Sequence, residues 1–365
     1  MSTATLPTPA AATAAPAQSA DAAPVIQANY TICPVLVASN VAVELGWLEE
    51  EIRKVGGNLN YLGALPESVG FLPHFSHKLD NFFRDGGNIP AIWAKADHTD
   101  TRLIGLTAAA RSAGHILVRA DSGVHTVAGL RGRKFGLYRS LNAGKVDFWR
   151  GTGERAIELA LALHGLARKD VEILDLDHDD DTFRRGGKPS EIFKDDVPSF
   201  AEVEVNALAE GRVDAIYSWP GRSRRLEATG TFKVIEDLDR HPDWTLGVAN
   251  SPWTITVNTA FSKEHPEVVV AYLRAAIRAG RWVNANRAAA ADILQRVAFG
   301  LDIDEVRAYV ATLPDFVPDL SAKNLAGIEI EKQFLLSHGY ISRDFDVKQW
   351  AAPEFLEQAR RSLSA

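Results

Sequence analysis

Short apolar runs rich in β-branched residues alternate with amphipathic helical stretches along most of this chain of 365 residues. The runs at residues 25–32, 101–108 and 115–119 have the composition of buried strands. Residues 267–285 instead carry a wide apolar face at helical spacing. Because strands that alternate with helices form mainly parallel sheets covered by helices, this order predicts an α/β fold. A chain of this length is predicted to form two domains or one large α/β unit.

Composition narrows the possible classes of function. The hydrophobic content of 46% and the charged content of 24% are ordinary for a soluble globular protein. The net charge of −7 is spread along the chain, which argues against a surface for nucleic acid or an anionic membrane. The longest apolar runs are shorter than a membrane span. A single cysteine excludes an intramolecular disulfide, and no Cys/His spacing is typical of a structural zinc site.

Two segments have the composition of exposed chain. Residues 1–24 consist mainly of Ala, Thr, Pro and Ser, and the first basic residue in the sequence is Arg53. This segment lacks the basic start of a secretory signal, so we expect a disordered tail on a cytoplasmic protein. Residues 175–196 are charged and contain Gly, Lys and Pro, which predicts a mobile surface loop. The aspartates of this loop lack the glycine and the closing glutamate of an EF-hand.

The only cysteine, Cys33, follows the first predicted strand and directly precedes Pro34. Proline fits the first position of a helix, so Cys33 is predicted to lie at the N-cap of a helix that carries Leu36 and Val41. There the helix dipole and the free N–H groups would lower the pKa of the thiol and favour the thiolate. The alternative is that a lone cysteine is a small buried hydrophobic side chain.

A second group of candidate polar residues follows further along the chain. His74 and His77 lie in an aromatic stretch, and Arg84 precedes the pair Gly86-Gly87. The two glycines are predicted to form a loop that opens onto a helix over 91–96. A guanidinium and glycine N–H groups could bind an anion, because glycine lets the backbone approach it closely. The alternatives are a core histidine, a surface ion pair of the arginine with its acidic neighbour, and a simple glycine turn.

Four stretches resemble type II solute-binding proteins of the sulfonate- and nitrate-binding kind, at residues 130–137, 207–216, 257–261 and 265–269. The resemblance implies a periplasmic-binding-protein-like α/β fold of two lobes, with the chain crossing twice between them and the active site in the cleft. The first lobe would comprise residues 25–117 and 252–365, and the second lobe residues 118–251.

A narrower resemblance lies within that fold. Tyr30–Pro34, His74-Phe75 and Arg84–Pro90 are similar to the active-site stretches of the aryl sulfinate desulfinases of dibenzothiophene desulfurisation. Further similarity runs from Tyr217–Trp219 to Gln349–Leu356. The resemblance implies a cytoplasmic, monomeric hydrolase without metal or organic cofactor. Its substrate would be a small aromatic sulfinate, 2'-hydroxybiphenyl-2-sulfinate or a close analogue, hydrolysed to the arene or phenol and sulfite.

By this resemblance Cys33, His74 and Arg84 are the expected catalytic residues. The expected substrate-binding residues are Arg84, Gly86, Gly87, Thr31 and Trp219. Cys33 could attack the sulfinate sulfur to give an enzyme thiosulfonate, or its thiol could protonate the ring carbon, and the sequence leaves both routes open. His74 would tune the thiol and relay a proton, with His77 as the rival for that role.

Three departures from the desulfinase pattern leave the aryl substrate open. The interval between the cysteine and the candidate histidine is several residues longer, the segment Arg222–Arg225 is basic, and the charged loop differs. Trp93, Trp149 and Trp219 are candidates for the lining of an aryl pocket. The alternative functions are a non-catalytic binding protein for sulfonates or other organic anions, and an enzyme acting on another small acid, since fold alone does not determine function.

Overall fold

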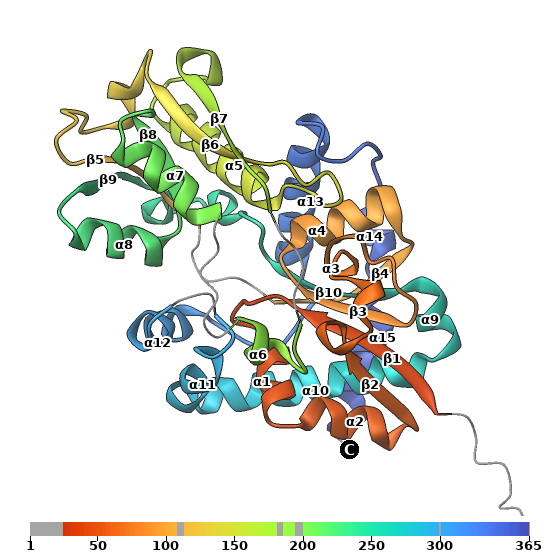
Figure 1. The fold of residues 1–365 in the computed structure, drawn as a ribbon. Helices are drawn as coiled ribbons and strands as arrows, with labels where there is room; N and C mark the ends of the chain where they lie inside the picture. The colour runs from red at the N-terminus through yellow and green to blue at the C-terminus, as the bar shows by residue number, and fades with distance from the viewer. Residues whose placement is uncertain (1–24, 108–112, 181–184, 194–199, 299–300, 365) are drawn as a thin grey trace, which may run out of the picture.

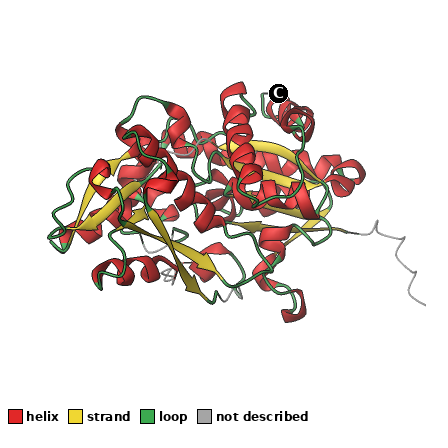
Figure 2. Ribbon diagram, turned by 90° about the horizontal axis from the view of Figure 1, so that it is seen from above, coloured by secondary structure: helices red, strands yellow, loops and turns green. Residues whose placement is uncertain are grey.

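The computed structural model describes residues 25–107, 113–180, 185–193, 200–298 and 301–364, so the predicted N-terminal tail lies outside it. The strands form two five-stranded sheets, each packed against helices, and each sheet defines one lobe. Figure 1 and Figure 2 show the two lobes next to each other along the length of the molecule. The predicted α/β class is therefore confirmed.

The first lobe is built on a mixed sheet with the strand order β2-β1-β3-β10-β4. Because β1 and β3 are parallel neighbours, their C-terminal ends lie at the same edge of the sheet. This edge brings Cys33, which directly follows β1, next to Gly86, the last residue of β3. The strands are β1 (Ile26–Ile32), β2 (Gly57–Tyr61), β3 (Phe82–Gly86), β4 (Thr101–Thr107) and β10 (Trp253–Asn258).

Helices cover both faces of this sheet. Leu103 and Ile104, neighbours on β4, pack into different apolar clusters because successive side chains of a strand point to opposite faces. On one face lie α1 (Ala38–Glu44), α2 (Trp47–Lys54), α10 (Pro266–Ala285), α11 (Arg287–Leu294), α12 (Ile303–Thr312) and α15 (Pro353–Ser362). On the other lie α4 (Asn88–Trp93), α13 (Ala322–Ser337) and α14 (Val347–Trp350), while α3 (Pro73–Ser76) and α9 (Thr259–Glu264) are short connections. The helix predicted over 267–285 is confirmed as α10.

The second lobe is built on a sheet with the strand order β7-β6-β8-β5-β9. β6 is parallel to β7 and β8, whereas β5 is antiparallel to β8 and β9. The strands are β5 (His115–Arg119), β6 (Lys134–Ser140), β7 (Glu172–His178), β8 (Ala215–Ser218) and β9 (Phe232–Asp237). The helices that pack on them are α5 (Phe148–Leu163), α7 (Phe200–Ala209) and α8 (Pro220–Ala228).

One segment of the second lobe is docked on the first. Helix α6 (Pro189–Phe193) lies between β7 and α7 in sequence, but in Figure 1 it lies beside α1. Phe193 is buried in an apolar cluster of the first lobe, and Lys188 Nζ is 3.0 Å from Glu44 Oε2. The prediction of a mobile surface loop over 175–196 is therefore wrong at α6, because residues far away in the sequence anchor it, and at residues 175–178, which belong to β7 (Glu172–His178). Residues 181–184 and 194–196 of the predicted loop lie outside the described residues.

The chain passes between the sheets after β4 and again after β9. The predicted lobe boundary between residues 117 and 118 falls inside β5, and all five residues of β5 belong to the second sheet. The predicted boundary at residues 251 and 252 falls in the second connection. The exact lobe limits stay a prediction. In the part of the chain that the structure describes, no helix combines the length and the apolar character that a membrane span requires.

Candidate active site

Cys33 lies in a loop, not at a helix N-terminus as predicted. Helix α1 begins only at Ala38, after two tight turns in which the N–H of Val35 bonds to the carbonyl of Cys33 and the N–H of Val37 to that of Val35. Asn40 Nδ2 holds the same two carbonyls from the first turn of α1. These local hydrogen bonds replace the helical ones that Pro34 at N1 would have started.

Three polar groups converge on the Cys33 sulfur. His74 Nε2 lies 3.2 Å from Sγ, and Arg84 Nη2 donates to Sγ at 3.3 Å. The backbone N–H of Gly87 also donates to it. His74 reaches this point from α3 and Arg84 from the middle of β3, so the cluster joins three separate segments of the first lobe. The structure thus brings together the three residues that the sequence singled out as catalytic.

The orientation of His74 is set by its second ring nitrogen. Nδ1 lies 2.7 Å from Thr31 Oγ1, and the imidazole stacks on the Phe71 ring with 5.0 Å between centroids. Thr31 is fully buried, and its hydroxyl positions His74. Its predicted contact with the substrate stays a prediction. This arrangement of nucleophile or acid, base and orienting group is the one that cysteine enzymes use.

Thr31→Val is expected to lower kcat for the proposed reaction about tenfold, because it removes the group that orients His74. The matched control is Thr256→Val, since Thr256 is equally buried and its hydroxyl contacts His77 Nε2 at 2.9 Å. Steady-state rates of both variants test the assignment. Equal effects of the two substitutions would contradict a specific role of Thr31.

The Arg84 guanidinium is fully buried and held by the protein itself. Nε donates to the carbonyl of His74 at 2.6 Å, and Nη1 donates to the carbonyl of Gly87 at 2.8 Å. With the bond to Cys33 these contacts use three of its five N–H donors. One N–H group on Nη1 and one on Nη2 remain for a substrate anion. Arg84 therefore cannot offer all of its donors to the substrate.

The two glycines let the backbone approach the sulfur closely. Gly86 has φ +151°, and a Cβ at this position would lie 2.1 Å from Cys33 Sγ. A Cβ on Gly87 would lie 2.5 Å from the side chain of Asn250, whose Oδ1 accepts the N–H of Ile89 at 2.9 Å. Asn250 thereby fixes the turn that presents the Gly87 N–H, a role that no sequence pattern signalled. The predicted glycine loop is instead the end of β3 and the N-cap of α4.

Gly86→Ala is expected to lower kcat/KM at least about 100-fold, because the added methyl group displaces the sulfur from its three partners. Gly247→Ala is the control, since its added Cβ meets no atom within 4 Å and its φ is not in the left-handed region. The test compares sulfite release and thermal midpoints of both variants. A fully active Gly86→Ala would mean that the close approach is not needed.

Burial raises the pKa of the Cys33 thiol above its ordinary value. The Arg84 guanidinium and the Gly87 N–H favour the thiolate and oppose this rise, whereas the Asp85 carboxylate adds to it. The predicted lowering of the pKa is therefore wrong, because the expected helix N-terminus is absent at this point and the side chain is buried. A raised pKa favours the protonated thiol over the thiolate as the resting form.

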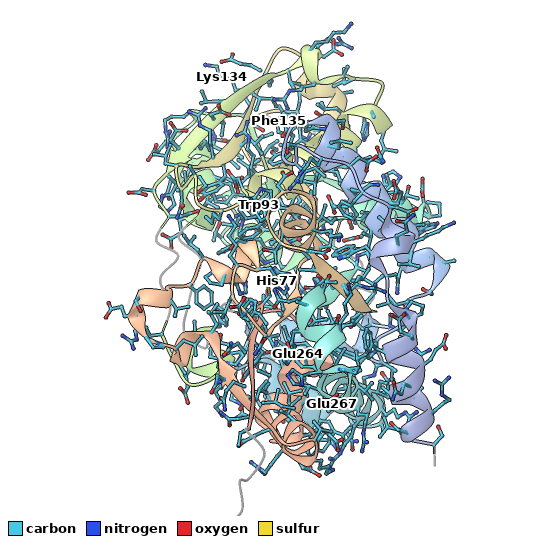
Figure 3. All side chains as sticks on the ribbon, turned by 90° about the vertical axis from the view of Figure 1, so that its right-hand side faces the viewer. His77, Trp93, Lys134, Phe135, Glu264 and Glu267 are labelled. Carbon is cyan, nitrogen blue, oxygen red and sulfur yellow. The ribbon has the colours of Figure 1, made fainter. Side chains whose placement is uncertain are left out.

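His77 and Trp93 lie apart from the sulfur contacts. His77 is fully buried, its Nε2 contacts Thr256, and burial together with Arg84 lowers its pKa to about 3. Trp93 packs edge-on against His98, and it does not line the cavity described below. In Figure 3 the second-lobe residues Lys134 and Phe135 lie above His77 and Trp93, and the first-lobe residues Glu264 and Glu267 lie below them. His74 is thus the histidine of the sulfur cluster.

An aromatic cavity of about 230 Å³ adjoins the cysteine loop between the lobes. From the first lobe Pro34, Val35 and Leu36 reach it directly after Cys33. Trp149 and Trp219, both predicted as pocket candidates, line it from the second lobe. The other aromatic residues of its wall are Phe148, Tyr217, Trp253 and Tyr309, which sequence reasoning missed. They come from four separate elements, so no local pattern marks them.

The basic segment Arg222–Arg225 supports this cavity. Arg222 is buried, its Nη2 lies 2.9 Å from Glu204 Oε2, and its guanidinium stacks 4.9 Å from the Trp219 ring. Arg224 is exposed and lines the cavity. Arg225 Nη1 pairs with Glu305 Oε2 of the first lobe at 2.8 Å. The charges that depart from the desulfinase pattern therefore position aromatic walls and connect the two lobes.

Among the described residues one His/Asp group has the spacing of a metal site. The ligand atoms of His115, Asp237 and Asp239 all lie within 4.8 Å of one another. Asp237 already accepts the N–H of Asp239, and Asp239 accepts the N–H of Ala113. The group lies in the second lobe, whereas the sulfur cluster lies in the first. A reaction without metal or cofactor stays a prediction.

The fold and the site together define a two-lobed α/β protein with a periplasmic-binding-protein-like fold and a buried thiol cluster beside the cavity between the lobes. No protein-family model matches the chain. The periplasmic sulfonate-binding protein SsuA from Methylobacillus flagellatus KT has the same architecture, with a TM-score of 0.67 and 21% identity over 93% of this chain and 95% of that one. The predicted periplasmic-binding-protein-like fold is confirmed.

The chain is 29% identical over 355 residues to the 2'-hydroxybiphenyl-2-sulfinate desulfinase of Rhodococcus erythropolis, across 91% of this chain and 93% of that protein. A crystal structure of a cysteine-to-serine mutant of the enzyme DszB, in complex with biphenyl-2-sulfinic acid, matches with a TM-score of 0.70. That match has 25% identity and covers 93% of this chain and 99% of the other. The desulfinase resemblance seen in the sequence is confirmed.

Proposed function

We propose that this protein is a desulfinase that hydrolyses the carbon–sulfur bond of an aromatic sulfinate and releases sulfite. The observation that carries the proposal is the Cys33 sulfur, which contacts His74, Arg84 and the Gly87 N–H beside an aromatic cavity. A simple anion receptor would need no thiol at this point. Similarity to the Rhodococcus desulfinase over 91% of the chain supports 2'-hydroxybiphenyl-2-sulfinate or a close analogue as the substrate.

The substrate would place its charged and its aromatic ends in different surroundings. The sulfinate carries a negative charge on two oxygens, for which the N–H groups of Arg84 and Gly87 are suitable donors. The aryl body would enter the cavity that Trp149 and Trp219 line, where the two indole rings pack edge to face with 5.2 Å between centroids at 84°. Such aromatic walls stabilise a ring by burial and by edge-to-face contact.

The protonated thiol supports proton donation as the first step. The Cys33 S–H proton is transferred to the ring carbon that bears sulfur, and the electron pair of the carbon–sulfur bond remains on the ring as the bond breaks. This step releases the arene and sulfur dioxide and leaves a thiolate beside Arg84. Water then adds to sulfur dioxide to give hydrogen sulfite, and the released proton returns through His74 to the thiolate.

The second route begins with His74 taking the thiol proton. The thiolate attacks the sulfinate sulfur, the aryl group leaves with the bonding electrons and takes the proton, and water hydrolyses the resulting enzyme thiosulfonate. The raised pKa of Cys33 disfavours this start, because the thiolate is scarce at neutral pH. We therefore propose the first route.

The deciding experiment measures sulfite release from 2'-hydroxybiphenyl-2-sulfinate and identifies the aromatic product. We expect one equivalent each of sulfite and 2-hydroxybiphenyl. If the protein instead binds the compound, shown by a higher thermal midpoint, and releases no sulfite, it is a receptor for organic anions and the proposed activity is wrong.

We further propose that the enzyme acts as a monomer in the cytoplasm. A free thiol that must stay reduced suits a compartment in which disulfides are rare. Light scattering after size exclusion tests the monomer, and fractionation of the source cells tests the compartment.

A further inference from the structure

Glu305 presents an unsatisfied acceptor at the wall of the aromatic cavity. The residue is 6% exposed, and its Oε2 accepts from Arg225 Nη1 at 2.8 Å and from the N–H of Asp302 at 3.1 Å. Its Oε1 is buried and has no hydrogen-bond partner among the described residues. A Cβ on Gly221 would lie 3.0 Å from Oε1, and both Gly221 and Glu305 line the cavity.

A buried carboxylate oxygen without a donor is unfavourable, and a ligand that supplies a donor relieves the penalty. The rest of the wall is mostly apolar, and the oxygen has no hydrogen-bond partner among the described residues that line it. Arg224 lines the same cavity. Arg224 would therefore repel a cationic substituent of the ligand, and Glu305 would repel an anionic one. A neutral O–H group is compatible with both residues.

We propose that Glu305 determines specificity for the aryl body, its Oε1 accepting a hydrogen bond from a hydroxyl group on the ring that occupies the cavity. The substrate of the proposed function carries such a hydroxyl group, and the new assignment is that Glu305 recognises it. The inference rests on the proposed function, because the sulfinate end is placed at Cys33. A charge-assisted hydrogen bond of this kind favours the hydroxylated compound over its unsubstituted parent by about tenfold or more.

Glu305→Gln is a sharp test because the geometry fixes how the new amide lies. The position of Oε2 receives two donors, from Arg225 and from Asp302, so the amide oxygen must occupy it. The NH₂ group then takes the position of Oε1. The substitution thereby replaces a hydrogen-bond acceptor at the cavity wall with a hydrogen-bond donor. Arg225→Met is the matched control, since it removes the ion pair between the lobes and leaves Oε1 in place.

The measurement is kcat/KM from sulfite release with biphenyl-2-sulfinate and its 2'-, 3'- and 4'-hydroxy and methoxy derivatives. We expect the wild type to prefer at least one hydroxy isomer to the parent and to the matching methoxy compound by about tenfold. Glu305→Gln should reduce the hydroxyl preference to about twofold and favour the methoxy acceptor, while Arg225→Met retains the wild-type order.

If the wild type releases sulfite from the parent compound but prefers no hydroxy isomer, the role of Glu305 is wrong. The proposed desulfinase activity is then still supported. A hydroxyl preference that persists in Glu305→Gln would also overturn the role of Glu305. The comparison of hydroxy and methoxy compounds in the wild type needs no variant, so a poorly folding substitution does not remove the test. Sulfite from none of the compounds would overturn the proposed function and this inference with it.

Discussion

Cys33→Ser is expected to lower kcat for sulfite release by about 1,000-fold or more while the fold persists. Serine keeps the size and the three hydrogen-bond partners at this position, but its hydroxyl is a much weaker acid than a thiol and a poorer nucleophile. The proposed route and its alternative both use the sulfur, so the loss does not depend on which of them is followed. The His74, Arg84 and Gly87 contacts hold the side chain where either step would take place.

The control for this variant is binding. Because serine leaves the anion donors and the aromatic cavity in place, Cys33→Ser should bind 2'-hydroxybiphenyl-2-sulfinate about as tightly as the wild type does. Calorimetric titration and thermal midpoints measure this directly. A variant that keeps more than a tenth of the wild-type rate would exclude Cys33 as the reacting group.

Asp85→Asn is expected to change the pH dependence of stability between pH 5 and pH 8. Asp85 is 1% exposed on β3, next to Arg84, and burial raises its pKa to about 7. The Ser39 hydroxyl and Arg84 oppose this rise in part. In the unfolded chain an aspartate has a pKa of about 3.9. The folded protein therefore keeps a proton on Asp85 that the unfolded chain has lost.

The sign of the effect follows from proton linkage. Between pH 4 and pH 7 the folded state binds more protons at Asp85 than the unfolded state, so this residue makes stability fall as the pH rises. Asparagine removes the contribution, whereas Glu331 and His77 contribute equally to both proteins. The free energy of unfolding of Asp85→Asn, relative to the wild type, should grow by about 3 kcal/mol between pH 5 and pH 8.

Urea unfolding at the two pH values measures this difference. Glu331→Gln is a useful comparison, since burial also raises the pKa of this fully buried carboxyl to about 7, at a place remote in sequence from the thiol. It should show a similar change in stability. A difference between Asp85→Asn and the wild type that stays constant with pH would mean that Asp85 does not titrate in this range.

The sequence by itself determined the class of the fold and the identity of the reactive cluster. Apolar runs and helical spacing are local properties, so β1, β4, β5 and α10 could be read from residue order. Cys33, His74, Arg84 and the glycine pair were also readable, because their order matches a known active site. Their mutual contacts in the structure agree with that assignment.

Only the tertiary structure decided the electrostatics and the shape of the site. The pKa of Cys33 rises instead of falling because packing buries the thiol and because Asn40 holds its loop out of the helix. Thr31, Asn250 and Glu305 act through partners that lie far from them in the chain. Burial and hydrogen bonding depend on which segments the fold brings together. Short-range sequence patterns do not specify these long-range contacts.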